Sequence, residues 1–530
     1  MKHVDFLDQL RGTAILAVLM FHSISTVYGY DVLPWDGWFR GFSVPNSFLW
    51  LLPLSVANVG VSIFFVVSGF CIHLSFQQQG RNWPGFFIRR IFRIYPAYLV
   101  VLVFFTLLYM HHFRLDLMSG QLWLHFFSHV FLIHNYPAGT IGSINGAFWS
   151  MAVEAQLYLI YPVLLILVAR SGWRRTLTIL AVTEVVIRGA DGMMDTLGMT
   201  GTLGRDVTWL FSVSPLGFWF SWAMGAALAD AFLNGRPLPF AKSPLILWGA
   251  LALVAYFVKP LFGFRFLLFA VMTAVVLSRR LTRTDTEAGA VSRWSNILKK
   301  IGVWSYSIYL LHQPLFNIYL AAIYLVIPAE SLSGLAAYGL VVLTWPLVIG
   351  LSVLWYNIFE IPGIALGRQI VRKFDGRSAA DAGVKKEEAS GGFFSFKSNQ
   401  TWMACALLIL ATGNLLLGFK LLPADPVANN NLAWSLATNP DASKRNGARA
   451  VELAESACQQ TQYQEIVMVG TLAAAYAEAG RFEDAITATQ RACGLAVKSG
   501  DTNLLQNNLA LLKWYQSRQP YRVQPGSSIR

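Results

Sequence analysis

The feature that most constrains the fold of this chain is a series of long apolar runs. A helix needs about 20 apolar residues to cross the roughly 30 Å of hydrocarbon in a bilayer. Such runs lie at 7–28, 57–77, 95–111, 146–168, 208–232, 244–258, 262–278, 301–327, 335–358 and 402–422. Segment 176–188 is shorter and contains Glu184 and Arg188, but the charge pattern requires it to cross as well. The sequence therefore predicts an all-α fold, a polytopic transmembrane helical bundle of ten spans plus one.

The composition excludes an ordinary soluble domain. Of the 530 residues, 55% are hydrophobic and only 13% are charged, far from the globular average. The formal net charge of +13 would suit nucleic acid, but Lys and Arg cluster beside the apolar runs, as membrane topology requires. We therefore expect the lipid bilayer as a partner, and no nucleic acid. The four cysteines lack CxxC or Cys/His ligand spacing, so we expect neither a disulfide scaffold nor a metal site.

The distribution of basic residues predicts the topology. With a cytoplasmic N-terminus, the basic loops at 81–93, 170–175, 236–242, 279–300 and 368–397 all fall on the cytoplasmic side, as the positive-inside rule requires. This holds only if residues 122–134 do not cross. We therefore expect a re-entrant or interfacial helix there.

The chain is expected to contain a membrane domain and a small external domain. We assign 1–360 to the membrane domain, 361–400 to a cytoplasmic linker rich in Gly, Ser, Ala and charge, and 401–422 to the extra span. The remainder, 425–520, is then a soluble α-helical domain in the periplasm or outside the cell.

That external domain has an internal repeat. Residues 450–458 resemble residues 485–493, and small residues occupy helix-contact positions. The period resembles that of tetratricopeptide repeats, which usually form a protein-binding surface; the alternative is a stabilising cap. Cys458 and Cys493 occupy equivalent positions, so we expect small core residues rather than a disulfide.

A polar stripe is predicted in the first apolar run. At about 100° and 1.5 Å per helical residue, Arg11 and His22 lie within roughly 20° of each other and about 16 Å apart. Asp8 falls within about 40° of the same line. Ionisable groups in lipid are costly and usually face a cavity. The alternative is that Asp8 and Arg11 mark the membrane edge while His22 snorkels or packs.

Three arginines precede the third apolar run. Arg89, Arg90 and Arg93 lie within Phe87–Pro96, and Arg90 and Arg93 share a helix face. Forked guanidinium groups suit phosphate oxygens. A purely topogenic role would require the same charges.

The apolar runs 146–168 and 301–327 contain further polar stripes. Ser150, Glu154, Tyr158 and Tyr161 repeat at four, four and three residues, and an intramembrane Glu with no neighbouring Lys indicates a functional or cavity-lining role. Ser305 and His312 lie one heptad apart and can face the same cavity, but the alternative is that His312 satisfies carbonyls freed by the following proline. Segment 60–70 contains small residues, for which close helix packing is the favoured interpretation.

Taken in this order, these segments resemble the acyltransferase family 3 membrane proteins, which O-acylate surface glycans and other acceptors. The matching segments are Leu7-Asp8 to Arg11 with ten residues before His22, Phe64 to Phe70, Arg90 and Arg93 with Tyr95-Pro96, Trp149-Ser150 to Glu154 with Gln156 and Tyr158, and Ser305 to His312 with Pro314. Together they extend over residues 1 to about 360, and their common order makes the resemblance specific.

The resemblance implies roles for these residues. His22 would be the catalytic base and Arg11 its partner in the cavity, while Arg90 and Arg93, with Arg89, would contact the phosphates of acyl-CoA arriving from the cytoplasm. Glu154 would be the family's acid, although Ala155 stands where relatives have a second acid. The implied function is transfer of an acyl group, by default acetyl from acetyl-CoA, to a hydroxyl of a surface carbohydrate. The implied location is the inner membrane of a bacterium.

Two other functions stay open from the residues alone. A polar stripe in a helical bundle also describes the path of a transporter or flippase for a surface-polymer precursor, although we find no inverted repeat between the two halves. The membrane part could also be a degenerate anchor for a repeat scaffold, but the polar residues that the resemblance requires are all present.

Overall fold

The structure is a computed structural model that describes residues 5–28, 54, 56–113, 120–136, 139–197, 203–282, 293–327, 331–374 and 426–523. Every regular element in these ranges is a helix, which confirms the all-α prediction for them. The chain divides into two compact units. The first unit comprises residues 1–107 and 119–420, and the second comprises residues 108–118 and 421–530.

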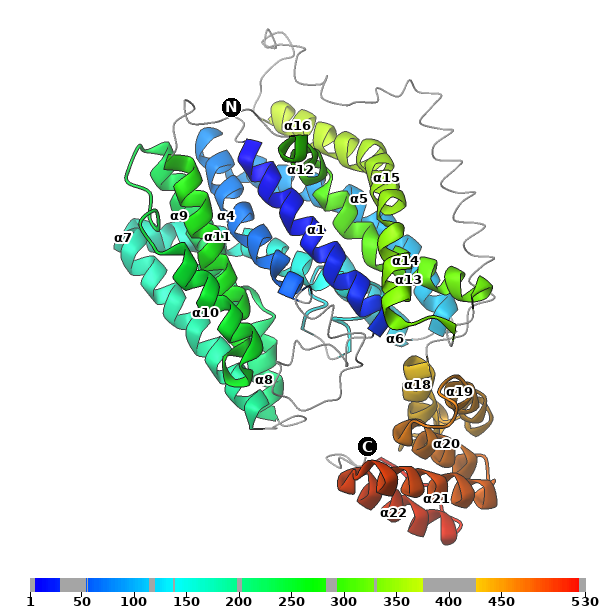
Figure 1. The fold of residues 1–530 in the computed structure, drawn as a ribbon. Helices are drawn as coiled ribbons and strands as arrows, with labels where there is room; N and C mark the ends of the chain where they lie inside the picture. Colours follow the sequence, from blue (N-terminus) through cyan, green and yellow to red (C-terminus); the bar gives the residue numbers. More distant parts are fainter. Residues whose placement is uncertain are drawn as a thin grey trace, which may run out of the picture. The chain divides into compact units, whose positions relative to one another are not determined.

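The first unit is a bundle in which α1 lies between α4 and α13 (Figure 1). Its main helices are α1 (Asp5–Tyr28), α4 (Gly60–Gln78), α5 (Trp83–Phe113, as far as residue 107), α6 (Gly120–Val130), α7 (Trp149–Thr196), α8 (Leu203–Ser212), α9 (Trp219–Leu233), α10 (Leu245–Phe257), α11 (Arg265–Thr282), α12 (Arg293–Val303), α13 (Ser305–Val326), α14 (Gly334–Leu343), α15 (Trp345–Trp355) and α16 (Ile361–Phe374). Six helical stretches in the described part are long and apolar enough to cross a membrane.

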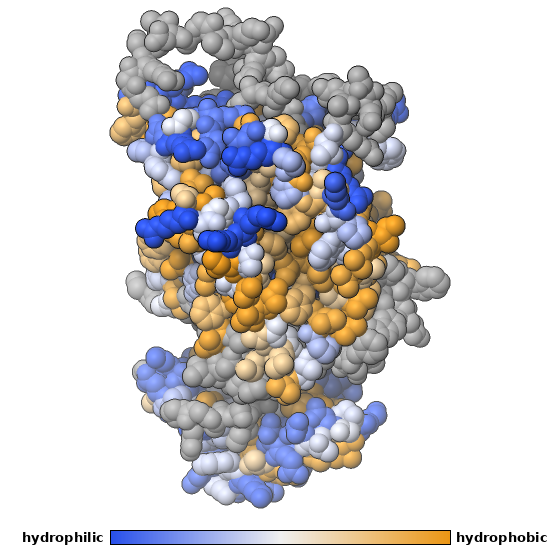
Figure 2. Space-filling view, turned by 90° about the vertical axis from the view of Figure 1, so that its left-hand side faces the viewer, coloured by the Kyte–Doolittle hydropathy of each residue, from blue (hydrophilic) through white to orange (hydrophobic). Residues whose placement is uncertain are grey.

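The outer surface of this bundle is apolar, as a lipid-facing surface must be. In Figure 2, hydrophobic residues gather in a belt beneath a hydrophilic end of the unit. Large apolar side chains on α7 and α10 are exposed, among them Leu159, Val186 and Ile246. In water such a surface would drive aggregation, so it supports a membrane-embedded unit.

The predicted spans 146–168 and 176–188 form one element with a sharp break. Gly172 interrupts α7 with φ 72° and ψ 164°, a backbone conformation that glycine adopts without a Cβ clash. The charges of the second half are paired inside the unit, because Arg188 Nε lies 3.1 Å from Glu184 Oε1. Glu184 also accepts hydrogen bonds from Ser221. This pairing explains how segment 176–188 can be apolar on its outside and still contain two charged residues.

Three predicted spans have different boundaries in the structure. Residues 208–232 are not one helix, because α8 ends at Ser212 and α9 begins at Trp219, with Pro215 in the connection. The span predicted from 301 begins at Ser305, after α12. The span 335–358 consists of α14, α15 and a π-helical turn, Tyr356–Glu360, that leads into α16. An apolar run in the sequence does not mark these breaks.

The region beyond residue 360 is only partly described. Residues 361–374, at the start of the predicted linker, form α16. The rest of the linker and the extra span predicted at 401–422 lie outside the described residues.

The short helix α6 corresponds to the predicted re-entrant or interfacial segment. Its 11 residues give a length of about 16 Å, roughly half of the hydrocarbon thickness. One face exposes Trp123 and Phe127, while His125 and His129 are buried beneath it. A helix of this length does not cross a bilayer alone.

The second unit is built from antiparallel helices that pack in sequence order. They are α18 (Pro426–Thr438), α19 (Gly447–Gln460), α20 (Ile466–Glu478), α21 (Phe482–Ser499) and α22 (Thr502–Gln516). Alanines dominate the core, and Cys458 is fully buried among them. Cys458 and Cys493 are both free thiols. The prediction that both are core residues is wrong for Cys493, which is only partly buried.

Candidate active site

A cavity of about 120 Å³ lies inside the first unit, between α1, α4, α5, α7 and α13. Seven of the residues singled out in the sequence line it: Arg11, Arg90, Arg93, Ser150, Glu154, Tyr158 and Ser305. These residues come from four separate sequence segments. The helices therefore bring together polar residues that are up to about three hundred positions apart in the chain.

Arg11 is held at the cavity wall by two neighbours. Its Nη1 lies 2.8 Å from Asp8 Oδ1, and its Nη2 lies 3.1 Å from the Sγ atom of Cys71 on α4. Asp8 itself is buried and does not line the cavity. Asp8 and Arg11 of the predicted stripe on α1 therefore have different roles. Asp8 orients the guanidinium of Arg11, and only Arg11 faces the cavity.

The carboxylate of Glu154 is fixed by hydroxyl groups. Its Oε1 accepts a hydrogen bond from Ser68 Oγ at 2.8 Å and another from Tyr158, one helical turn further along α7. Ser68 in turn accepts a hydrogen bond from Trp222 Nε1 at 3.2 Å. A carboxylate that receives several hydrogen bonds has a defined position inside an apolar bundle.

Ser68 is a site residue that sequence reasoning missed. Segment 60–70 favoured close packing, and packing is indeed found at Gly69, where a Cβ would lie 2.0 Å from the Trp222 carbonyl oxygen. Ser68 differs, because it lines the cavity and holds Glu154. A serine next to a glycine on an apolar helix carries no signal that separates these two roles.

The arginines of α5 are not equivalent. Arg90 and Arg93 line the cavity and Arg89 does not. This follows from helix geometry, since residues three apart share a face and adjacent residues point about 100° apart. With Arg11, the cavity has three guanidinium groups and one carboxyl group, Glu154, in its wall. An anionic ligand fits this balance.

Ser150 and Tyr309 connect the cavity to the start of α7. The two hydroxyl oxygens are 2.7 Å apart, and Tyr309 also donates a hydrogen bond to the carbonyl of Ala147. Tyr309 lines the cavity and was not singled out in the sequence. It lies four residues after Ser305, so the seven-residue spacing between Ser305 and His312 does not include it.

His22 and His312 lie beside each other rather than in the cavity wall. Their ring centroids are 4.8 Å apart, and neither residue belongs to the lining. His312 Nδ1 contacts the carbonyl oxygens of Tyr309 and Ile308. Since Tyr309 lines the cavity, the histidine pair contacts a residue of the cavity wall without belonging to the wall itself.

A buried acid on the π-helical turn was also missed. Glu360 is 3% exposed and accepts a hydrogen bond from Ser307 Oγ at 2.8 Å. A π-helical turn is rare and often occurs at functional sites. In the sequence, Glu360 is a single acid at the end of an apolar run. It coincides with the predicted domain boundary at 360 and so does not stand out as a site residue.

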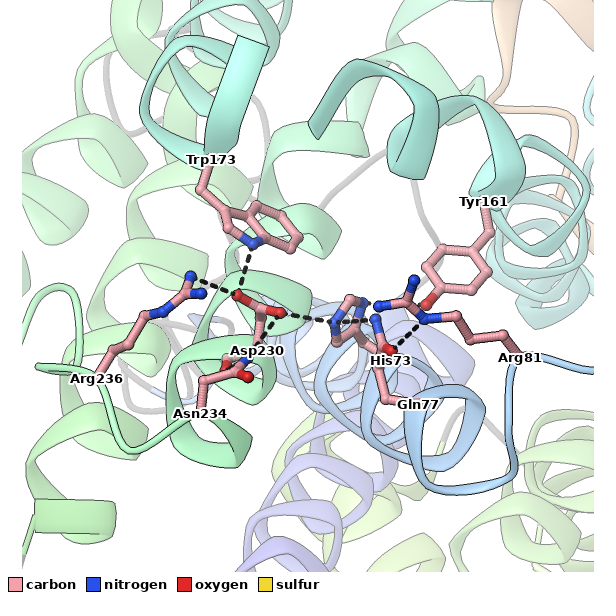
Figure 3. A network of polar contacts seen from close by, with 8 residues as sticks. All are labelled: His73, Gln77, Arg81, Tyr161, Trp173, Asp230, Asn234 and Arg236. Atoms are coloured by element: carbon pink, nitrogen blue, oxygen red, sulfur yellow. Dashed lines mark hydrogen bonds and ion pairs between the residues drawn. The ribbon is translucent and has the colours of Figure 1, made fainter. Parts of the chain in front are cut away.

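A second polar cluster joins the C-terminal parts of α4 and α9 to the middle of α7 (Figure 3). His73 lies at its centre, with Nδ1 3.0 Å from Tyr161 OH and Nε2 3.6 Å from Asp230 Oδ1. Trp173 donates to Asp230 at 2.9 Å. Tyr161 contacts this cluster. Ser150, Glu154 and Tyr158, the other members of its helix stripe, line the cavity instead. The contacts of these groups with one another indicate a clamp between three helices.

Within the described ranges, no group of three or more His, Cys, Asp or Glu side chains could hold a metal ion.

The chain is similar in sequence to a known protein family and to several known proteins. A family model described as Acyltransferase domain matches residues 4–355. The peptidoglycan O-acetyltransferase OatA of Listeria monocytogenes is 24% identical over 349 residues, which cover 60% of this chain and 50% of that protein. The acyltransferase MdmB of Streptomyces mycarofaciens is 25% identical over 268 residues, 49% of this chain and 68% of that protein. The chain thus spans only about half of the Listeria relative. No solved structure matches.

Proposed function

The chain belongs to acyltransferase family 3, whose domain matches residues 4–355, and from that premise we propose that it is a membrane O-acyltransferase. The proposed reaction moves an acyl group from cytoplasmic acyl-CoA to a hydroxyl of a cell-surface or exported carbohydrate. Acetyl is the proposed acyl group, because the Listeria relative is named a peptidoglycan O-acetyltransferase. The observation that carries the proposal is the gathering of Arg11, Arg90, Arg93 and Glu154 around one buried cavity.

The cavity, about 120 Å³ in volume, has room for several water-sized groups. The thioester end of the donor is proposed to enter it. The phosphates would stay at the mouth, where Arg90 and Arg93 present forked, permanently charged donors.

The proposed chemistry is general-base catalysis by His22. The imidazole accepts the proton of the acceptor hydroxyl, the hydroxyl oxygen forms a bond to the thioester carbonyl carbon, and the carbon–sulfur bond breaks. The proton held by His22 passes to the departing thiolate. Arg11, oriented by Asp8, is proposed to bind the donor at the arginine end of the cavity, about 16 Å along α1 from His22. Glu154, held by Ser68 and Tyr158, is proposed to position the reacting groups.

The proposed topology places the donor and the acceptor on opposite sides of the membrane. The N-terminus and the arginines of α5 are proposed to be cytoplasmic, following the positive-inside rule. The second unit is proposed to lie in the periplasm or outside the cell, with α18–α22 acting as tetratricopeptide-like repeats that bind a protein partner. Reporter fusions at residues 375 and 523 test both sides, and a cytoplasmic signal at residue 523 would contradict this arrangement.

The activity is tested by a genetic and a biochemical measurement. Mass spectrometry of surface glycans from a deletion strain should show a missing acyl group, restored by the wild-type gene and not by His22→Ala. Purified protein in nanodiscs should release CoA from acetyl-CoA in the presence of the glycan acceptor. Unchanged glycans together with precursor movement across vesicles would favour the transporter or flippase.

A further inference from the structure

His312 has a hydrogen-bonding atom that the fold leaves unused. The side chain is 0% exposed, and its Nδ1 lies 2.9 Å from the Tyr309 carbonyl oxygen and 3.2 Å from that of Ile308. A carbonyl only accepts hydrogen bonds, so Nδ1 carries the proton. The other ring nitrogen, Nε2, therefore has a free lone pair. It is buried and has no hydrogen-bond partner among the described residues.

The ring of His22 lies beside the ring of His312. The two rings meet edge to face, with centroids 4.8 Å apart and planes at 62°. His22 is only 8% exposed, so its surroundings are fixed mainly by protein. At this separation a rotation of the His22 ring, with His312 held by its two carbonyl contacts, brings an N–H of His22 within hydrogen-bond reach of His312 Nε2.

Helix geometry does not by itself require His312. Pro314 lacks an N–H and so deprives the Leu310 carbonyl, four residues earlier, of its helical partner. That carbonyl accepts a hydrogen bond from Asn145 Nδ2 at 3.2 Å. Asn145 therefore satisfies the carbonyl that the proline leaves without a helical partner. His312 is not needed for that purpose, so its buried Nε2 requires another explanation.

Resting on the proposed function, we propose that His312 is a positioning residue for the catalytic base. His312 Nε2 accepts a hydrogen bond from one ring N–H of His22, which fixes the other His22 nitrogen as the one with a lone pair. That nitrogen faces the acceptor hydroxyl. His312 keeps its own proton on Nδ1 throughout.

The same contact assists proton transfer. When His22 takes the hydroxyl proton, both of its nitrogens carry hydrogen and the ring is positively charged. The hydrogen bond to His312 then becomes charge-assisted and stronger. An interaction that strengthens as the reaction proceeds raises kcat rather than substrate affinity.

A double-mutant cycle on the full chain in nanodiscs tests this. His312→Ala should lower kcat for acetyl transfer about 10- to 150-fold, the loss expected for one hydrogen bond to a charged group, with KM for acetyl-CoA within about twofold. His312→Gln, which offers an amide oxygen as acceptor, should recover part of the rate. The double variant with His22→Ala should be no slower than His22→Ala alone, because the two residues act as one unit.

The control is His73→Ala, which removes another buried histidine of the same unit from the cluster of Figure 3. Per folded molecule its kcat should match the wild type. Full kcat in His312→Ala, or multiplicative losses in the double variant, would overturn the proposal. If His312→Ala does not fold, the rate of His312→Gln decides in its place. A wild-type protein that transfers no acyl group would instead refute the proposed function itself.

Discussion

Arg89 and Arg90 are adjacent residues whose comparison separates donor binding from membrane topology. Arg90 lines the cavity and Arg89 does not. Both carry one positive charge at the same end of α5, so the positive-inside rule values them equally. Donor binding distinguishes the two residues, because only Arg90 lines the cavity and can reach a phosphate at its mouth.

Arg90→Gln removes one of three guanidinium groups in the cavity wall. A hydrogen bond to a charged group contributes about 1.5–3 kcal/mol, and about 1.4 kcal/mol corresponds to a factor of ten. We therefore expect the Kd for CoA to rise about 10- to 150-fold. Arg90→Lys keeps the charge without the fork and should give an intermediate loss. Arg89→Gln, the matched control, should change Kd by less than about twofold, because Arg89 does not line the cavity.

Titration calorimetry of each variant with CoA in nanodiscs measures these values. Repeating it at higher ionic strength should weaken the wild-type interaction more than that of Arg90→Gln, since one screened contact is already gone. Thermal melts establish that each variant is folded. Equal weakening by Arg89→Gln and Arg90→Gln would refute the reasoning and leave these residues a topogenic role.

Three further outcomes are expected from packing. Arg188→Met should destabilise the protein by about 3–5 kcal/mol because it leaves the Glu184 charge buried and unpaired, while replacing both residues by Met should restore the melting temperature. Burial raises the pKa of Cys458 from 9.0 to about 12, so its thiol should resist maleimide at pH 7–9 and react after unfolding. Because the unfolded thiol ionises at lower pH than the folded one, the protein should lose stability as the pH rises from about 9 to about 12. Tyr521→Ala should cost about 3–5 kcal/mol and speed hydrogen exchange in α18, because Tyr521 is buried against Trp434.

The parts of the site that the sequence predicted depend on local helix periodicity. Ser150, Glu154 and Tyr158 recur every four residues and do line one cavity, because spacing along a single helix fixes which side chains share a face. The same rule explains Arg90 and Arg93. Such predictions need no knowledge of the neighbouring helices.

The parts that were missed depend on contacts between helices. Ser68 becomes a site residue only because α4 lies against α7, where Glu154 is. Glu360 is placed by a π-helical turn that an apolar run does not announce. The break between α8 and α9 is different, because Pro215 lies in the connection and is a local signal within the predicted span 208–232.

Two helices independently indicate that charge recognition and proton transfer occupy different ends of the site. On α1, His22 lies eleven residues beyond Arg11, about 16 Å along the axis, and on α13 His312 lies seven residues beyond Ser305, about 10 Å. Arg11 and Ser305 both line the cavity, whereas the two histidines meet beyond its wall. Changes at the arginine end should therefore raise KM for the donor and leave kcat, while changes at the histidine end should do the reverse. A variant series in which both parameters moved together at either end would mean that the cavity and the histidine pair are one site, and the route from donor to acceptor along α1 would have to be abandoned.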